Sequence, residues 1–223
     1  MYRRLVLLGP PAAGKGTQAE LLKEKFGFLA PSVGAMLREQ KAAGTPAGLR
    51  AAEYFERGLL VPDEISIEVV RQWVSTTEGP WVMDGYPRTV RQADAFEAML
   101  AERDTAIDLA LLIEADEAVI RDRVMHRLVC QKCGGVFRAG MHVVAPTDPC
   151  PRCGGVLGRR ADDNVEALAD RLSEYRTKTQ PVIAWYQSRG ILHRIDGNRE
   201  IPLVFADVTA ALNPARPADT SIS

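Results

Sequence analysis

Five short runs of consecutive apolar residues recur along the chain, and longer stretches with a helical spacing of apolar side chains separate them. Continuous apolar runs are typical of strands buried on both faces, whereas strands with one solvent-facing side alternate polar and apolar positions. Helices between such strands make parallel crossover connections the natural link. The pattern therefore predicts an α/β fold whose core is a doubly wound, five-stranded parallel sheet. The predicted strands cover residues 5–8, 28–31, 81–83, 109–113 and 192–195.

Two segments interrupt this alternation and are interpreted as insertions. Residues 32–62 form a helical excursion with several helix-breaking residues, and residues 128–160 hold all four cysteines together with many glycines and prolines. Residues 214–223 include prolines and few apolar side chains, so we expect a disordered tail. The two insertions divide a core that is predicted to consist of residues 1–31, 63–127 and 161–213.

Composition and charge fit an ordinary globular protein. Hydrophobic residues make up 46% of the sequence and charged residues 26%. The chain has 28 basic and 29 acidic side chains, which gives a net charge of -1. No global field would attract nucleic acid or anionic lipid, so any anion site must be local. The first apolar run stops at Gly9, and no stretch approaches the roughly 18 apolar residues of a membrane span. We expect a cytoplasmic protein with no nucleic-acid or membrane partner.

A glycine-rich stretch, residues 9–17 with the sequence GPPAAGKGT, follows the first predicted strand and precedes an amphipathic helical pattern. This is the context of a phosphate-binding loop, in which backbone N–H groups turn toward an anion at a helix N-terminus. Lys15 would add a full positive charge, and the hydroxyl of Thr17 could bind Mg²⁺. Gly16 separates these two residues, so the strict P-loop motif is not met. Taken alone, the stretch also permits a tight turn with a surface lysine.

The cysteines form two C-x2-C pairs, and a Gly-Gly step follows each pair. In a chain expected in the cytoplasm this spacing favours metal over disulfides and fits a four-thiolate zinc site. Such a site has no open position for substrate, so we expect structural Zn²⁺ that stabilises an insertion too small for its own core. A zinc ribbon that binds nucleic acid is the alternative, but between the outer cysteines the only lysines and arginines are Lys132, Arg138 and Arg152, and the only aromatic residue is Phe137. The predicted ligands are Cys130, Cys133, Cys150 and Cys153.

The stretch DGYPRT at residues 84–89 comes directly after the third predicted strand, and Gln92 follows one helical turn later. Together with GKGT at residues 14–17, it resembles the adenylate kinases, and the resemblance covers nearly the whole chain. The family implies the reaction MgATP + AMP ⇌ 2 ADP on a P-loop core with two mobile insertions. By this resemblance residues 32–62 would clasp the monophosphate, and residues 128–160 would form a zinc-binding lid that closes over ATP.

The resemblance also implies roles for individual residues. The many arginines suit phosphoryl transfer, because charge develops on the equatorial oxygens and arginine presents a fixed fork of donors. Contacts with ATP are implied for Ala12, Ala13, Gly14, Lys15, Gly16, Thr17, Arg123, Arg127, Val136, Phe137 and Arg199. Contacts with AMP are implied for Val33, Arg38, Leu59, Leu60, Val61, Gly85, Tyr86, Pro87, Arg88, Gln92, Arg160 and Arg171. The implied catalytic residues are Lys15, Arg88, Arg123, Arg160, Arg171 and Asp84, which would help to hold the magnesium waters.

Three positions depart from the family pattern, which usually has glycine at Ala12, threonine at Val33 and aspartate at Ala35. The methyl group of Ala12 would strain the loop if the backbone there takes an angle open only to glycine. The other two changes remove polar groups beside the monophosphate and the magnesium waters. Asp63 and Glu64 are interpreted as carboxylates that favour the first turn of a helix, not as catalytic residues.

Two alternatives therefore stay open: a kinase for another nucleoside monophosphate, and a weakly active nucleotide-binding regulator on the same fold. Gln92 matches the position that contacts adenine, so AMP remains the expected acceptor. Retention of Lys15, Asp84 and the arginines counts against a pure binder. We expect ATP, AMP and ADP as partners, Mg²⁺ with ATP and structural Zn²⁺ as cofactors, and a monomer.

Overall fold

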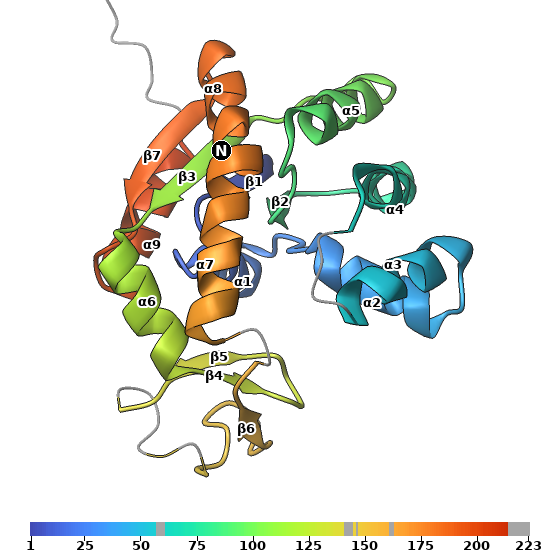
Figure 1. Cartoon of the computed structure of the whole chain (residues 1–223). Helices are drawn as coiled ribbons and strands as arrows, with labels where there is room; N and C mark the ends of the chain where they lie inside the picture. Colours follow the sequence, from blue (N-terminus) through green and yellow to red (C-terminus); the bar gives the residue numbers. More distant parts are fainter. Residues whose placement is uncertain (57–60, 141–144, 146, 161–162, 214–223) are drawn as a thin grey trace, which may run out of the picture.

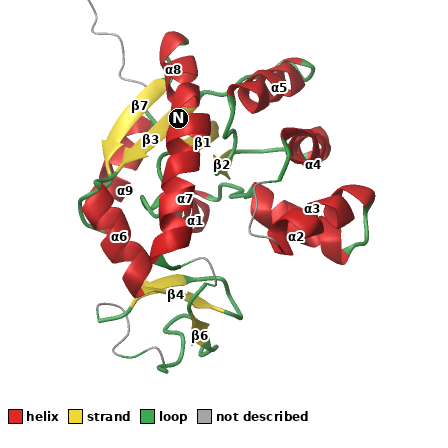
Figure 2. Cartoon of the chain, in the orientation of Figure 1, coloured by secondary structure: helices red, strands yellow, loops and turns green. Residues whose placement is uncertain are grey.

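The computed structural model describes residues 1–56, 61–140, 145, 147–160 and 163–213 (Figure 1). The interpretations of Leu59, Leu60 and the tail 214–223 lie outside the described residues. Within the described part, helices and strands alternate as expected for an α/β protein (Figure 2). None of the helices there combines the length and the apolar character needed to cross a membrane.

The core is a sheet of four parallel strands in the order β2-β1-β3-β7. Leu5 of β1 pairs in register with Val82 of β2 on one side and with Leu109 of β3 on the other. The predicted α/β fold with a parallel sheet is confirmed. The strands are β1 (Arg4–Leu8), β2 (Trp81–Asp84), β3 (Leu109–Glu114) and β7 (Leu192–Asp196).

The prediction of a fifth strand at residues 28–31 is wrong. That segment runs beside β2 and exchanges some backbone hydrogen bonds with it: the amide of Leu29 donates to Pro80, and the amide of Val82 donates to Leu29. It forms only two isolated bridges, at Leu29 and Ser32. The segment stops there because Pro31 has no N–H for a ladder and Ser32 already caps the next helix, with its Oγ accepting from the amide of Ala35.

Nine α-helices and a short π-helical turn surround the sheet in the described residues. Three of the α-helices begin at side-chain caps, Ser32, Thr89 and Asn164, each of which accepts a hydrogen bond from a backbone amide of the first turn. The helical elements are α1 (Lys15–Phe26), α2 (Val33–Ala42), α3 (Pro46–Glu56), α4 (Asp63–Thr76), α5 (Val90–Ala101), α6 (Glu117–His126), α7 (Val165–Glu174), η1 (Tyr175–Thr179), α8 (Gln180–Ser188) and α9 (Ile201–Ala211).

Alternate side chains of β1 enter two hydrophobic layers, one on each face of the sheet. Leu5 and Leu7 pack in a cluster with residues of α1 and α9. Val6 and Leu8 pack in a second cluster with residues of α4, α5 and α8, and α2 and α3 extend this cluster away from the sheet. Burial on both faces explains why the strands at the centre are continuous apolar runs.

Two smaller units project from different sides of this core (Figure 1). One is the α2–α3 pair, where Gly48 lets the helices approach so closely that a Cβ would lie 2.2 Å from the backbone of Gln40. The other is a small antiparallel sheet in the order β5-β4-β6, at the ends of α6 and α7. Its strands are β4 (Arg127–Cys130), β5 (Val136–Arg138) and β6 (Leu157–Gly158).

Candidate functional site

The glycine-rich loop connects the end of β1 to the start of α1. Gly9 has a φ of 139°, and a Cβ on it would lie 2.2 Å from the carbonyl oxygen of Ile113, so only glycine fits. Gly14 has a φ of 108° and immediately precedes the helix. The ammonium group of Lys15 donates to the carbonyl oxygens of Gly9 and Pro10, both at 2.8 Å. The lysine therefore lies across its own loop, at the helix N-terminus where an anion is stabilised.

The backbone of Ala12 is left-handed, with a φ of 58°. Strain at this alanine was predicted from the sequence for such a conformation. This conformation brings the Cβ of an L-residue close to the backbone and costs free energy that glycine avoids. The methyl group also has neighbours: it packs against a cluster that includes Ile120 of α6 and Leu168 of α7. Strain in the loop thus coincides with a contact to the two helices that carry Arg123 and Arg171.

Charged groups converge on Lys15. Burial is the main reason that its pKa falls to about 8; the charge of Asp84 opposes this shift, and the charges of Arg88, Arg171 and Arg127 add to it. Asp84, at the end of β2, lies beside Gly16 in the first turn of α1. A Cβ on Gly16 would lie 3.2 Å from Oδ2 of Asp84. The glycine that breaks the strict motif thus has a steric reason.

Arg123 of α6 links two loops at the carboxyl ends of the strands. Its guanidinium donates to the carbonyl oxygen of Ala13 at 3.0 Å and to that of Gly197 at 2.7 Å. Gly197 lies between β7 and α9, in the same loop as Arg199. The latter forms ion pairs with Asp207 and, at 3.7 Å, with Asp196. Arg123 is thus beside the phosphate loop, whereas Arg199 is held by acidic neighbours of its own.

Arg127 and Asp163 form a buried bidentate ion pair at the junction of the small sheet with the core. Nε of Arg127 lies 2.8 Å from Oδ2 of Asp163, and Nη2 bonds to the other carboxylate oxygen. The Arg127 side chain is 12% exposed and that of Asp163 is 0% exposed. The pair ties the start of β4 to the segment that leads into α7.

A network of hydrogen bonds surrounds Gln92, whose side chain is buried. Its Nε2 donates to Oδ1 of Asp63 at 2.6 Å, and its Oε1 accepts from the amide of Arg88 at 2.7 Å. Thr89 donates its hydroxyl to Oδ2 of Asp63 at 2.7 Å and caps α5 by accepting from the amide of Gln92. The guanidinium of Arg88 is exposed and folds back to the carbonyl oxygen of Gly85 at 2.8 Å.

Other residues expected on the AMP side lie on α2, at Val61 before α4, in the loop after β2 and after β6. Val33 is buried, and Val61 packs against the same hydrophobic cluster, which also contains Tyr86. The peptide bond between Tyr86 and Pro87 is cis. Arg38 on α2 and Arg160 after β6 are exposed.

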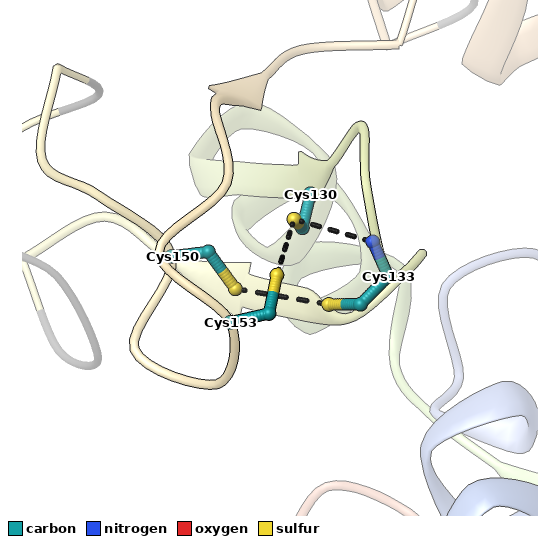
Figure 3. A group of neighbouring side chains, drawn as sticks. All are labelled: Cys130, Cys133, Cys150 and Cys153. Carbon is teal, nitrogen blue, oxygen red and sulfur yellow. Dashed lines mark hydrogen bonds between the residues drawn. The ribbon is translucent and has the colours of Figure 1, made fainter.

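The four cysteine sulfurs converge in the small sheet (Figure 3). All lie within 4.8 Å of one another, with 3.5 Å between the sulfurs of Cys130 and Cys153 and 3.7 Å between those of Cys133 and Cys150. A tetrahedral zinc ion with Zn–S bonds of 2.3 Å requires sulfurs about 3.8 Å apart, and a disulfide requires about 2 Å. The spacing fits a four-thiolate metal site and not a pair of disulfides.

Backbone geometry supports the same conclusion. Each C-x2-C pair turns in the same way: the amide of Gly134 donates to the carbonyl of Cys130, and the amide of Gly154 donates to that of Cys150. The backbone N–H of Cys133 also donates to the sulfur of Cys130 at 3.5 Å, a contact that favours the thiolate that a metal needs. The donor set, its spacing and its backbone support fit Zn²⁺.

Comparison with known proteins decides the family. The family model described as "Adenylate kinase" matches residues 7–191. The chain is a member of the adenylate kinase family. It is 42% identical over 210 residues to an adenylate kinase of Geobacillus sp. (strain WCH70), covering 93% of this chain and 97% of that protein. It is 41% identical over 210 residues to one of Methanosarcina acetivorans, with 93% and 97% covered, and 42% identical over 214 residues to one of Paracoccus denitrificans, with 96% and 98% covered.

Some of the site residues expected for an adenylate kinase lie together around the phosphate loop. Lys15, Asp84, Arg88, Arg127 and Arg171 interact electrostatically around the phosphate loop. In the small sheet, the side chain of Val136 is exposed, and Phe137 packs with the cysteine cluster.

Two side-chain contacts at the site were not predicted from the sequence. Asp63 does lie in the first turn of α4 as expected, but it also holds Gln92 and Thr89. No role was predicted for Asp163, yet it is the partner of Arg127. The sequence shows only that each acidic residue lies next to a predicted helix start. This position does not indicate which side chain the carboxylate contacts.

Proposed function

We propose that the protein transfers the terminal phosphoryl group of MgATP to AMP and yields two ADP. The observation that carries this proposal is the set of charges around the phosphate loop, where Asp84 and three arginines act on Lys15, in a chain of the adenylate kinase family. Phosphoryl transfer needs positioning and electrostatic stabilisation more than a base. Such a set is suited to that chemistry.

The proposed roles follow from the positions of these side chains. Lys15 and the backbone N–H groups at Gly14–Thr17 hold the phosphates of ATP, and Arg123 supports the loop through the carbonyl of Ala13. Arg88 and Arg171 stabilise charge on the transferring group. Mg²⁺, which adenylate kinases use with ATP, would be held with the help of Asp84 and Thr17 and would neutralise phosphate charge.

We further propose that the two projecting units close over the nucleotides. Residues 32–62 would bind the monophosphate, with Arg38 gripping its phosphate and Val33, Val61 and Gln92 beside its base. Residues 128–160 would cover ATP, with Val136, Phe137 and Arg199 near its adenine and Arg160 reaching the reacting phosphates. Closure would exclude water, so that phosphoryl transfer is favoured over hydrolysis.

Zinc has a structural role in this proposal. Cys130, Cys133, Cys150 and Cys153 would hold Zn²⁺ through four thiolates, which leaves no position for substrate. The hydrophobic cluster of the small sheet contains few buried residues besides two of these cysteines: Leu128 and Leu157 in the described part. The metal would therefore supply stability that this cluster lacks.

The proposed setting is a cytoplasmic monomer that works without nucleic-acid or membrane partners. The net charge of -1 supports the proposed absence of nucleic-acid and membrane partners, because it provides no long-range attraction to polyanions. Closure of two units over the substrates would let one chain complete its own site.

A coupled assay on the purified protein tests the proposed reaction. MgATP is supplied with AMP, CMP, UMP, GMP or dAMP in turn, and ADP formation is followed. We expect AMP to give the highest kcat/KM. Failure of every monophosphate to accelerate ADP formation would leave a nucleotide-binding regulator as the better account, and preference for another base would change the acceptor.

A further inference from the structure

The amide of Gln92 has a fixed direction. An amide has one end that donates and one that accepts, and the two neighbours of this side chain match those ends: the carboxylate of Asp63 faces Nε2 at 2.6 Å, and the backbone N–H of Arg88 faces Oε1 at 2.7 Å. Gln92 is 4% exposed. Its orientation is thus chosen by protein groups before any ligand is considered.

The reversed amide would be strongly disfavoured. Rotation by half a turn would place Oε1 against the carboxylate of Asp63, two acceptors in contact, and Nε2 against the N–H of Arg88, two donors in contact. Both groups would lose their partners in a buried position, which is where unmade hydrogen bonds are most costly. The Asp63 contact carries a full charge and is the stronger of the two constraints.

Asp63 is itself well held. Its second carboxylate oxygen accepts from the hydroxyl of Thr89 at 2.7 Å, and Thr89 caps α5. Tyr86, next to the network, packs edge-on against Phe96 with ring centroids 5.3 Å apart. The constraint on Gln92 therefore rests on the starts of two helices, α4 and α5.

We propose that Asp63 determines which base the acceptor nucleotide may carry, by holding the amide of Gln92 in the direction that pairs with adenine. This inference rests on the proposed function. After its two protein contacts, the amide keeps one N–H at Nε2 and one lone pair at Oε1. Adenine offers a donor at its 6-amino group with an acceptor beside it, which matches this pair. A 6-oxo purine offers the reverse pattern and would need the reversed amide.

Steady-state kinetics with AMP and IMP test the proposal, because IMP carries oxygen in place of the 6-amino group and a hydrogen on N1. The ratio of kcat/KM for AMP to that for IMP is measured in the wild type, in Asp63→Asn and in Glu64→Gln. The last variant is the matched control: it removes the same charge from the adjacent residue, whose carboxylate is exposed and pairs with Arg91.

We expect the AMP-to-IMP ratio to fall about tenfold in Asp63→Asn, the scale of one base-directed hydrogen-bond pair, and to stay unchanged in Glu64→Gln. The KM for MgATP should not change in either variant. A ratio in Asp63→Asn within about threefold of the wild type, with AMP still used, would overturn the role of Asp63. A wild type that transfers nothing to AMP would instead refute the proposed function.

A measurement on the wild type, with Gln92→Met used only for assignment, covers the case in which Asp63→Asn does not fold. The two Nε2 protons of Gln92, assigned by their loss in Gln92→Met, are followed by nuclear magnetic resonance. We expect one set of signals that exchange slowly with solvent. Two sets of signals would show an amide that populates both directions, and rapid exchange with solvent would show an amide that its neighbours do not hold; either result would contradict the proposal.

Discussion

Ala12 has a φ of 58°, so the cost of its left-handed backbone can be tested by a single substitution. A left-handed alanine costs about 1 to 2 kcal/mol, while glycine costs the folded state about 0.5 to 1 kcal/mol in chain entropy. We therefore expect Ala12→Gly to raise the free energy of unfolding by about 0.5 to 1 kcal/mol, measured by urea denaturation.

Ala13→Gly is the matched control in the same loop. Ala13 is buried and has an ordinary φ, so the change removes a packed methyl group and adds chain entropy. It should lower the free energy of unfolding by about 1 kcal/mol. If both glycine variants were destabilised alike, the packing of Ala12 against α6 and α7 would outweigh its backbone strain.

Lys15 gives a pH dependence whose sign is fixed by its lowered pKa of about 8. In the free protein this lysine loses its charge as the pH rises through 8. A bound phosphate favours the charged form and raises the pKa, so nucleotide binding above pH 8 must take up a proton. We expect affinity for MgATP to fall with rising pH in that range, and calorimetry in buffers of different ionisation enthalpy to detect the proton uptake.

Lys15→Arg supplies the comparison, because arginine stays charged throughout this range. Its binding of MgATP, weaker or not, should show no proton uptake from residue 15. Equal uptake by the two proteins would mean that another group titrates and that Lys15 is already charged in the free state.

At the scale of elements, the proposed zinc site makes the stability of the small sheet depend on its four cysteines. Cys130→Ser removes a thiolate from the buried side of the cluster, and serine oxygen is a poor replacement for a zinc ligand. We expect loss of the bound zinc, measured by elemental analysis, and a clear drop in melting temperature by calorimetry.

Val156→Ser is the control within the same unit. This valine is 67% exposed, and its replacement should leave both zinc content and melting temperature unchanged. Wild-type protein that carries no metal and melts like Cys130→Ser would rule out a stabilising zinc site.

The Arg127–Asp163 pair connects the small sheet to the core, and its burial sets the size of the expected effect. Asp163→Ala leaves the Arg127 guanidinium largely buried without its carboxylate, so the free energy of unfolding should fall by about 3 to 5 kcal/mol. Glu68→Ala breaks the exposed pair between Glu68 and Arg50 and should cost less than about 1 kcal/mol. Urea denaturation of both variants makes the comparison, and similar losses would contradict a special role for the buried pair.

At the scale of the whole molecule, the parts of the fold set by local pattern could be predicted from the sequence. Burial on both faces of the sheet produces continuous apolar runs, and four of the five runs are strands. The exception, residues 28–31, is apolar for the same reason, but Pro31 and the capping residue Ser32 end the pairing with β2. The hydrophobic pattern alone does not show that the proline and the helix cap end strand pairing at this point.

The same distinction applies to the candidate site. The phosphate loop and the cysteine pairs are formed by residues close together in the sequence, so their chemistry could be predicted from the sequence. The contacts of Asp63 with Gln92 and of Asp163 with Arg127 span 29 and 36 positions. Acidic residues are common near helix starts, so the positions of Asp63 and Asp163 in the sequence give no reason to expect a distant partner. Only the folded structure shows that each carboxylate contacts that partner.

The most direct test of the central claim is to observe both substrates and the product together. Phosphorus-31 nuclear magnetic resonance of the purified protein with MgATP and AMP should show the signals of ATP and AMP decreasing in equal amounts, while ADP rises by twice that amount and inorganic phosphate does not form. Release of inorganic phosphate with AMP unchanged would show hydrolysis instead of transfer. Unchanged spectra would show that this site binds nucleotides without moving a phosphoryl group.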